Sequence, residues 1–217
     1  GSSFSWSPSA TLNSGSNANP EATPLITTDY IVLVSNSGCT DQDTIRVNVS
    51  VPSVSAGTDL AVCVGDSVQI QAQGTGSVVW SPAGGLSATN VLDPFAFPIA
   101  TTDYIVTLTD SATCIAQDTI QVLVNQLPVA NAGADTSACT NEMIVIGGAP
   151  TGPSGSTYTW SPAGGLSDAN SANPTATITG TQIYTVTVTD SSTCSSTDVI
   201  TINALAIPNV DAGPDTT

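Results

Sequence analysis

Four residue types recur three times along this 217-residue chain at almost fixed spacing, and this repetition limits what the chain can fold into. The three sets are Trp6, Pro20, Tyr30 and Cys39; Trp80, Pro94, Tyr104 and Cys114; and Trp160, Pro174, Tyr184 and Cys194. Successive tryptophans lie 74 and 80 residues apart. Solenoid repeats are about 20 to 50 residues long, whereas a repeat of this length can bury its own core. The sequence therefore predicts separate domains arranged as beads on a string.

A second recurring segment, the marker, indicates the domain boundaries. The text AGTDLAVC at residues 56–63 recurs as AGADTSAC at residues 132–139, and the chain stops inside a third copy, DAGPDTT. A proline precedes each marker, where its fixed φ and missing N–H end a strand and stiffen a short linker. These prolines are Pro52, Pro128 and Pro208. We expect the C-terminal part of one domain at residues 1–51, complete domains at 52–127 and 128–207, and the start of a further repeat at 208–217.

The pattern of apolar residues predicts strands. Val68, Ile70 and Ala72 alternate with glutamines, and the stretch from Tyr184 to Val188 alternates apolar residues with threonines. This period of two is that of a strand with one buried face, and no segment holds the stripe of an amphipathic helix. Such strands, separated by Gly, Pro, Asn and Asp turns, describe a β-sandwich. We therefore expect an all-β fold in which the recurring Trp is the main core aromatic and the Tyr packs beside it.

The charge of the chain limits its partners. With 17 acidic residues, a single arginine, no lysine and no histidine, the formal net charge is −16 at pH 7. A surface of this sign repels the phosphate backbone and anionic lipid headgroups, so we expect no nucleic-acid or membrane contact. No apolar run approaches the roughly 18 residues of a membrane-spanning helix. No signal sequence is present, so we expect any export signal or anchor to lie outside this segment.

All five cysteines occupy repeat positions, which is typical of a disulfide framework in an oxidising compartment. Cys63 and Cys139 end the two markers, whereas Cys39, Cys114 and Cys194 follow the tyrosine segment. If each complete domain closes on itself, the pairs are Cys63 with Cys114 and Cys139 with Cys194. Cys39 is then unpaired because the front of its domain is missing. Loops of about 50 residues would stabilise each domain by roughly 4 kcal/mol.

A second pairing of the cysteines stays open. A simple sandwich can place the marker cysteine and the hairpin cysteine of one domain at opposite ends, about 25 Å apart. The hairpin cysteine would then meet the marker cysteine of the preceding domain, which gives Cys63 with Cys194. We expect the intradomain pairing, because a self-contained domain needs no register with its neighbour. Zinc is disfavoured, since the chain has no C-x-x-C motif and no histidine.

The residue inventory argues against an enzyme. Without His or Lys the chain has no Ser–His, Cys–His or Ser–Lys dyad, and no amine for a Schiff base. A pair of glycosidase carboxylates would have to come from Glu21, Glu142 and the aspartates. Most aspartates recur at repeat positions, where Asp side chains bond their own backbone in turns. A catalytic carboxylate is not expected once in every domain, so we predict no catalytic site.

Calcium is a separate case, because Asp59, Asp135 and Asp215 lie close to the domain joints. A hard cation held there by several oxygens would stiffen the chain. However, no D-x-D-x-D-G loop is present, and Asp29 and Asp103 are not kept in the third copy. We therefore expect no cofactor.

The recurring text resembles a known repeat family. The segments WSPAGGLS, TTDYIVTLTD, QDTIQVLV and AGADTSAC are similar to the PKD-like, immunoglobulin-type repeats of giant secreted proteins in Bacteroidetes, including surface adhesins and filamentous appendages. The similarity covers nearly the whole chain. It implies tandem immunoglobulin-like sandwiches, type IX secretion, an extracellular or cell-surface location, and a role as the stalk or filament body of an adhesin. The first copy departs from the pattern by having SATL in place of AGGL.

The resemblance also implies partners and a modification. The partners would be neighbouring repeats of the same chain and other copies in a filament. In the host group of this family, O-glycosylation is expected at Ser or Thr that follows Asp and precedes a small or aliphatic residue or Thr, and the candidates are Thr44, Ser67, Ser111, Thr119 and Thr216. Unmodified hydroxyls are the alternative, because so short a motif often arises by chance. The alternative function is a carbohydrate-binding or accessory module of a secreted enzyme, which would need an exposed aromatic platform.

Overall fold

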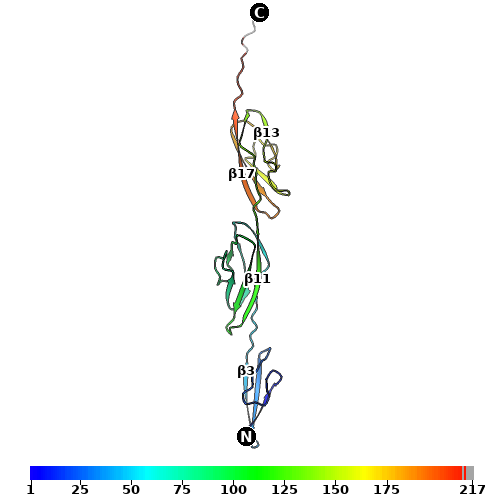
Figure 1. Cartoon of the computed structure of the whole chain (residues 1–217), viewed down its shortest axis with the longest axis vertical. Coiled ribbons are helices and arrows are strands. Elements are labelled where there is room, and N and C mark those ends of the chain that lie inside the picture. Colours follow the sequence, from blue (N-terminus) through cyan, green and yellow to red (C-terminus); the bar gives the residue numbers. More distant parts are fainter. Residues whose placement is uncertain (212, 214–217) are drawn as a thin grey trace. The chain divides into compact units, whose positions relative to one another are not determined.

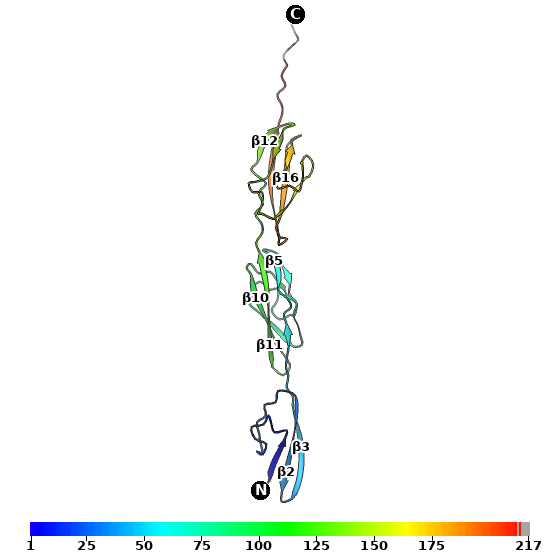
Figure 2. The same cartoon turned by 90° about the vertical axis from the view of Figure 1, so that its right-hand side faces the viewer.

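The computed structural model of the chain describes residues 1–211 and Gly213, so Asp215 and Thr216 lie outside it. Every regular element of these residues is a strand and none is a helix (Figures 1 and 2), which confirms the all-β expectation. The chain divides into two compact units. The first unit holds Gly1–Thr58, Gln69–Phe95 and Asp103–Gln121, and the second holds Asp59–Val68, Ala96–Thr102 and the chain from Val122 onward.

The N-terminal repeat forms one antiparallel sheet within the first unit. Its strands are β1 (Ser3–Ser7), β2 (Thr28–Asn36) and β3 (Cys39–Val47), in the order β1-β2-β3. The register places Trp6 opposite Val32 and Tyr30 opposite Ile45. Two of the recurring aromatic residues therefore lie on neighbouring strands of one sheet.

The middle repeat has one main sheet and two short ones. The main sheet has the order β5-β11-β10-β8, and its opening strand β5 runs parallel to its last strand β11. The short sheets are β4-β7 and β6-β9. The strand bounds are β4 Val54–Ser55, β5 Leu60–Cys63, β6 Val68–Gln69, β7 Gln73–Gly74, β8 Ser77–Ser81, β9 Phe95–Ala96, β10 Thr102–Thr109 and β11 Ile115–Asn125.

The last repeat lies in the second unit and follows the same plan. Its main sheet has the order β12-β17-β16-β14, with β12 parallel to β17, and a second sheet pairs β13 with β15. The strand bounds are β12 Thr136–Cys139, β13 Met143–Val145, β14 Thr157–Ser161, β15 Thr175–Thr177, β16 Gln182–Thr189 and β17 Ser195–Leu205. The fold is thus a series of immunoglobulin-like β-sandwich repeats. In the middle and last repeats the opening strand is added in parallel to the edge of the hairpin sheet.

The recurring tryptophan is the centre of each complete core. Trp80 is 1% exposed and Trp160 is 2% exposed, and both lie on the strand that pairs with the tyrosine strand. Each indole N–H donates to a backbone carbonyl eleven residues later, over 2.9 Å to Val91 and 3.0 Å to Ser171. A buried Trp needs such a partner for its N–H. The loop between Trp and Pro, which has the same length in all three repeats, supplies this partner.

The recurring tyrosine packs in the same core, as the sequence predicts. Tyr104 and Tyr184 are buried, and their hydroxyls donate to the backbone carbonyls of Gly84 at 2.9 Å and Gly164 at 3.1 Å. Burial raises the pKa of both phenols. The hydroxyl therefore ties the loop after the tryptophan to the hairpin, since each glycine belongs to the text WSPAGGLS.

A repeat-position aspartate fixes the start of each opening segment. The Asp118 carboxylate on β11 accepts the backbone N–H of Ala56 at 2.8 Å, and Asp198 on β17 accepts that of Ala132 at the same distance. Asp118 also accepts the N–H of Thr119 at 2.9 Å. The hydrogen bond from Ala56, followed by that from Thr119, lowers the pKa of Asp118.

Acid should weaken this contact. Because the pKa of Asp118 is lower in the folded chain, its contribution to stability is present above the ordinary carboxyl pKa of about 3.9 and is lost as the pH falls through the folded pKa. We expect Asp118→Asn to reduce the loss of stability between neutral and strongly acidic pH, measured by urea unfolding at each pH. Glu21→Gln, at an exposed carboxylate, serves as the control. Identical profiles for Asp118→Asn and the unmodified chain would contradict the assignment.

Candidate functional site: a disulfide that links two repeats

The feature with the clearest functional geometry is a disulfide between Cys63 and Cys194, both in the second compact unit. Cys63 is the last residue of β5 in the middle repeat, and Cys194 directly precedes β17 in the last repeat. Their Cα atoms lie 5.6 Å apart, within the usual range for a disulfide, and 131 residues separate them in the sequence. The bond therefore joins two successive repeats covalently.

The hairpin turn that carries Cys194 is held by an aspartate. The Asp190 carboxylate accepts the backbone N–H groups of Ser192 at 2.9 Å and Cys194 at 3.0 Å. Thr193 has a positive φ of 65°, which the backbone adopts to complete the turn. Asp190 therefore has the turn role that the sequence predicts. Because its hydrogen bonds fix the backbone of the turn, Cys194 is held in position.

The hairpin also contacts the linker that precedes its own repeat. The Ser196 hydroxyl donates to the backbone carbonyl of Pro128. On the other side of the linker, the backbone N–H of Val64 donates to the carbonyl of Asn125 at 2.9 Å, directly after the disulfide-bonded Cys63. The disulfide is thus flanked by polar contacts to the segment between the two repeats, and sequence reasoning did not identify Ser196 or Asn125.

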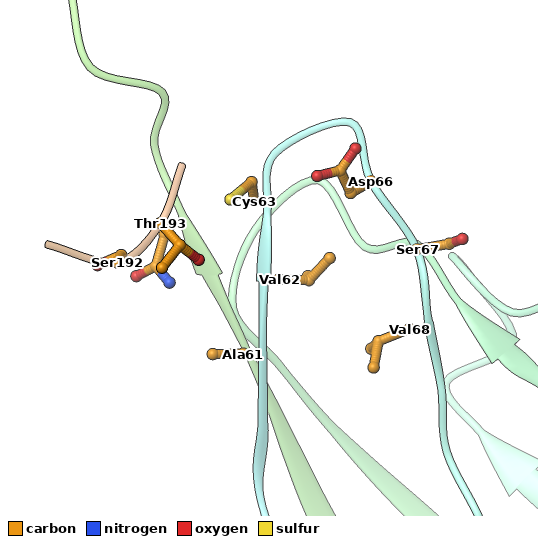
Figure 3. Close-up of a pocket in the computed structure, with 9 residues that line it drawn as sticks. Ala61, Val62, Cys63, Asp66, Ser67, Val68, Ser192 and Thr193 are labelled. Carbon is orange, nitrogen blue, oxygen red and sulfur yellow. The ribbon is translucent and has the colours of Figure 1, made fainter. Parts of the chain in front are cut away.

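A shallow hollow of about 430 Å³ lies beside the disulfide (Figure 3). It is lined by Ala61, Val62, Cys63, Asp66, Ser67, Val68, Asn125, Ser192 and Thr193. In Figure 3 the hairpin residues Ser192 and Thr193 lie on one side of Cys63, and Asp66 and Ser67 lie on the other side. The lining offers one carboxylate, that of Asp66, and several hydroxyls. Because Cys63 and the hairpin residues Ser192 and Thr193 all line it, the hollow is part of the joint that the disulfide makes.

The expected intradomain disulfides are wrong: neither Cys63–Cys114 nor Cys139–Cys194 is formed, and the alternative pairing of Cys63 with Cys194 is present. The reason is the parallel register of the opening strand. Cys63 lies opposite Asn125, at the far end of β11 from Cys114. Eleven strand residues span about 36 Å, far beyond the reach of a disulfide. The last repeat repeats this arrangement, since Cys139 lies opposite Leu205 at the far end of β17 from Cys194.

Three cysteines have free thiols in this structure. Cys39 and Cys139 are exposed, and Cys114 is half-buried. Cys39 is unpaired as expected, but Cys114 and Cys139 are unpaired as well. Cys114 holds the hairpin position of Cys194, and Cys139 holds the marker position of Cys63. Each free cysteine thus occupies a position that is equivalent to one half of the observed bond.

The other candidate residues take separate places. Thr44, Ser67, Ser111 and Thr119 are all exposed. The Asp135 carboxylate accepts the backbone N–H of Thr201 at 2.7 Å, which is a structural use of a residue considered above for calcium. Among residues 1–211 and 213, no three His, Cys, Asp or Glu side chains gather in a way that would hold a metal ion. No helix in the described chain is long and apolar enough to cross a membrane.

Comparisons with known proteins give only distant structural likeness. No family model and no curated protein matches the chain. Among solved structures, a three-domain I-band fragment of titin is 11% identical with a TM-score of 0.45, covering 94% of this chain and 88% of that one. Extracellular domains 3–5 of Drosophila OTK are 10% identical with a TM-score of 0.41, covering 94% and 85%. The insect immune protein hemolin is 10% identical with a TM-score of 0.38, covering 94% and 67%.

Proposed function

We propose that this chain is a stalk or filament segment of an extracellular adhesin, in which immunoglobulin-like repeats are tied to one another by disulfides. The observation that carries the proposal is the Cys63–Cys194 bond. A bond between repeats is of little use to a domain that works alone. It is useful in a spacer, because it carries load from one repeat to the next without passing through the hydrogen bonds of the sheets.

The repeat boundaries and the location belong to this proposal. The chain comprises the C-terminal part of a repeat at 1–51, complete repeats at 52–127 and 128–207, and the start of another at 208–217. A disulfide between repeats requires an oxidising compartment, which supports a secreted or cell-surface location. The similarity of the marker and hairpin text to PKD-like repeats of giant Bacteroidetes proteins supports the adhesin assignment. Neighbouring repeats of the same chain are the proposed partners, together with other copies in a filament.

Surface modification fits the same setting. The described residues that follow an aspartate in the expected O-glycosylation context are exposed and therefore accessible to a modifying enzyme. Glycans on a stalk would keep neighbouring chains apart and protect the strands from proteases. The intact mass of material from the native host tests this point, because a mass equal to that of the bare polypeptide would exclude the modification.

A carbohydrate-binding module is the second candidate, because Phe95 and Phe97 are 50% and 48% exposed. Sugar sites use exposed aromatic rings. The counterparts of these residues in the last repeat are Thr175 and Thr177, so no aromatic platform recurs. Tyr158, the aromatic residue gained in the last repeat, is half-buried and packs against the core. The distribution of aromatics therefore favours a spacer.

Binding measurements separate the two candidates. We expect the full chain to show no saturable binding to a panel of neutral and acidic polysaccharides by calorimetry or affinity electrophoresis. Phe97→Ala and Tyr158→Ala should behave as the unmodified chain does. Saturable binding that is lost in Phe97→Ala and kept in Tyr158→Ala would favour the binding-module function over the spacer function.

A further inference from the structure

One segment of the middle repeat exposes large apolar side chains that the last repeat does not have. In the stretch PFAFPI at residues 94–99, the first, third and fifth residues are buried, and the outward residues are Phe95, Phe97 and Ile99. Their exposed fractions are 50%, 48% and 89%. We name these three residues the ridge. Apolar side chains that gather on the surface of a soluble domain in this way mark interaction sites.

The last repeat has threonines at the three ridge positions. The backbone N–H of Ser87 donates to the carbonyl of Phe95 at 2.9 Å, and that of Ser167 donates to the carbonyl of Thr175 at 2.8 Å. Each serine hydroxyl accepts the N–H of the same partner in return, at 2.9 Å and 3.0 Å. The counterparts of the ridge are therefore Thr175, Thr177 and Thr179. Since the last repeat adopts the same fold without these apolar side chains, the fold does not need them.

The small threonines leave a shallow groove on the surface of the last repeat. The groove has a volume of about 520 Å³, and its lining consists of Met143, Gly165, Leu166, Ser167, Thr175 and Thr177. Strand β15 lies along the middle of it, because it pairs with β13 on one side and is hydrogen-bonded to residues 165–167 on the other. None of the six lining residues is charged.

The residues that flank the ridge and the groove are of opposite kinds. Ile70 and Ile146 each donate their backbone N–H to a proline carbonyl at 3.0 Å, so β6 and β13 hold equivalent places before them. On β13, Met143 and Val145 lie opposite the threonines of β15 and are 70% and 68% exposed. The corresponding residues of the middle repeat are Ser67 and Gln69. An apolar centre with a polar flank in the middle repeat thus becomes a small polar centre with an apolar flank in the last one.

Neighbouring repeats leave both surfaces uncovered. Thr177 and Thr179 are exposed in the last repeat, which has a complete repeat before it, so a preceding repeat does not cover the ridge positions. The ridge itself is exposed in a repeat that has a complete repeat after it. Ser67, the counterpart of Met143, is exposed although it lines the hollow beside the Cys63–Cys194 bond to the following repeat. The exposure is therefore a property of these positions in the repeat.

Charge and size favour a second copy of the chain as the occupant of the groove. Two chains with a net charge of −16 repel each other, so they approach best where carboxylates are absent. The groove lining and the ridge carry none. Pockets of about 300 to 1,000 Å³ take ligands of drug size, so a groove of about 520 Å³ has room for the ring of Phe97.

We propose that the ridge of one copy docks in the groove of a second copy. The ring of Phe97 fills the groove over the β15 threonines, and Met143 contacts the ring through its sulfur, which favours aromatic neighbours. Each copy carries one ridge and one groove, so the contact is heterologous and can continue from copy to copy. The inference rests on the proposed filament role and names the surfaces through which copies associate.

A single contact of this kind is weak. Two aromatic rings that are half exposed offer together roughly 150 to 250 Å² of surface, far below the roughly 1,200 Å² of a standard interface. In a filament the copies are held side by side, and the raised effective concentration lets many weak contacts act together. Measurements in solution therefore need concentrated protein and salt of about 0.5 M, which screens the repulsion between the chains.

The first test places the photoreactive residue benzoylphenylalanine at Phe97. The full chain, with its three free thiols alkylated, is irradiated as an equal mixture of unlabelled and isotope-labelled copies, and mass spectrometry locates the cross-links. We expect links between copies at Met143, the single methionine of the chain, or at Leu166. The control carries the same residue at Val79, which is 57% exposed and lies outside the ridge, and it should not reach Met143. Links confined to one copy, or the same links from Val79, would overturn the proposal.

A pair of complementary variants tests the heterologous contact. Phe97→Thr introduces the residue of the last repeat and removes the centre of the ridge. Thr177→Glu places a charge in the groove at an exposed position, so both variants should keep the fold. In sedimentation equilibrium each should weaken self-association by about tenfold, because an aromatic anchor at the centre of an interface dominates its binding.

Mixing the two variants should restore one contact. The intact ridge of the Thr177→Glu chain can enter the intact groove of the Phe97→Thr chain, and association then stops at a dimer of one copy of each. Unchanged association in either variant alone, or no recovery in the mixture, would contradict the proposal. Saturable polysaccharide binding that requires Phe97 would assign the ridge to a sugar instead. The spacer proposal is tested separately, because chains that do not associate still carry the Cys63–Cys194 bond.

Discussion

Replacing Cys63 and Cys194 together by serine is expected to lower the free energy of unfolding by about 5 kcal/mol. The disulfide closes a loop with a sequence separation of 131 residues, and in the chain-entropy model a longer loop restricts the unfolded chain more strongly. The loop contains all strands from β6 to β16. A domain is usually stable by only about 5 to 15 kcal/mol, so the loss should be evident as a large shift of the urea midpoint.

A matched variant separates this effect from the removal of a thiol. Cys114→Ser changes a hairpin cysteine in the same turn geometry but breaks no bond, and it should leave the midpoint nearly unchanged. Reduction of the unmodified chain should reproduce the double serine variant. If the double variant and Cys114→Ser unfold at the same urea concentration, the bond does not stabilise the repeats.

The core of each complete repeat could be predicted from the sequence because it depends on local spacing. Trp160 and Tyr184 recur at fixed intervals and sit on alternating apolar strands, and the structure buries both. The turn role of Asp190 was likewise predictable, since an aspartate followed by small residues bonds its own backbone. Features of this kind can be predicted because they depend only on the two-residue period of a strand and on the hydrogen bonding of a turn.

The cysteine pairing could not be predicted because it depends on the direction in which one short strand is added. The parallel register places Cys63 beside Asn125 and the next repeat, at the far end of β11 from Cys114. The contact of Ser196 with Pro128 was missed for the same reason, because it joins segments that only the register of the sheets brings together.

The second large effect concerns extension under force. When the chain is pulled by its two ends, an intact Cys63–Cys194 bond carries the load past the enclosed loop. Residues inside the loop are then shielded even if their sheets unfold. Reduction allows the enclosed loop, which corresponds to a sequence separation of 131 residues, to extend. At a fully extended length of about 3.6 Å per residue, this adds about 470 Å to the contour length of the chain. A spacer that must keep its reach under tension benefits from this bypass.

Single-molecule pulling of the chain from its termini, with and without reductant, tests the central claim most directly. We expect the contour length after complete unfolding to increase by about 470 Å on reduction, with Cys63→Ser/Cys194→Ser giving the long value under both conditions. Cys114→Ser should behave as the unmodified chain does, since its thiol is free. Equal contour lengths in oxidising and reducing buffer would contradict a covalent link between the two repeats.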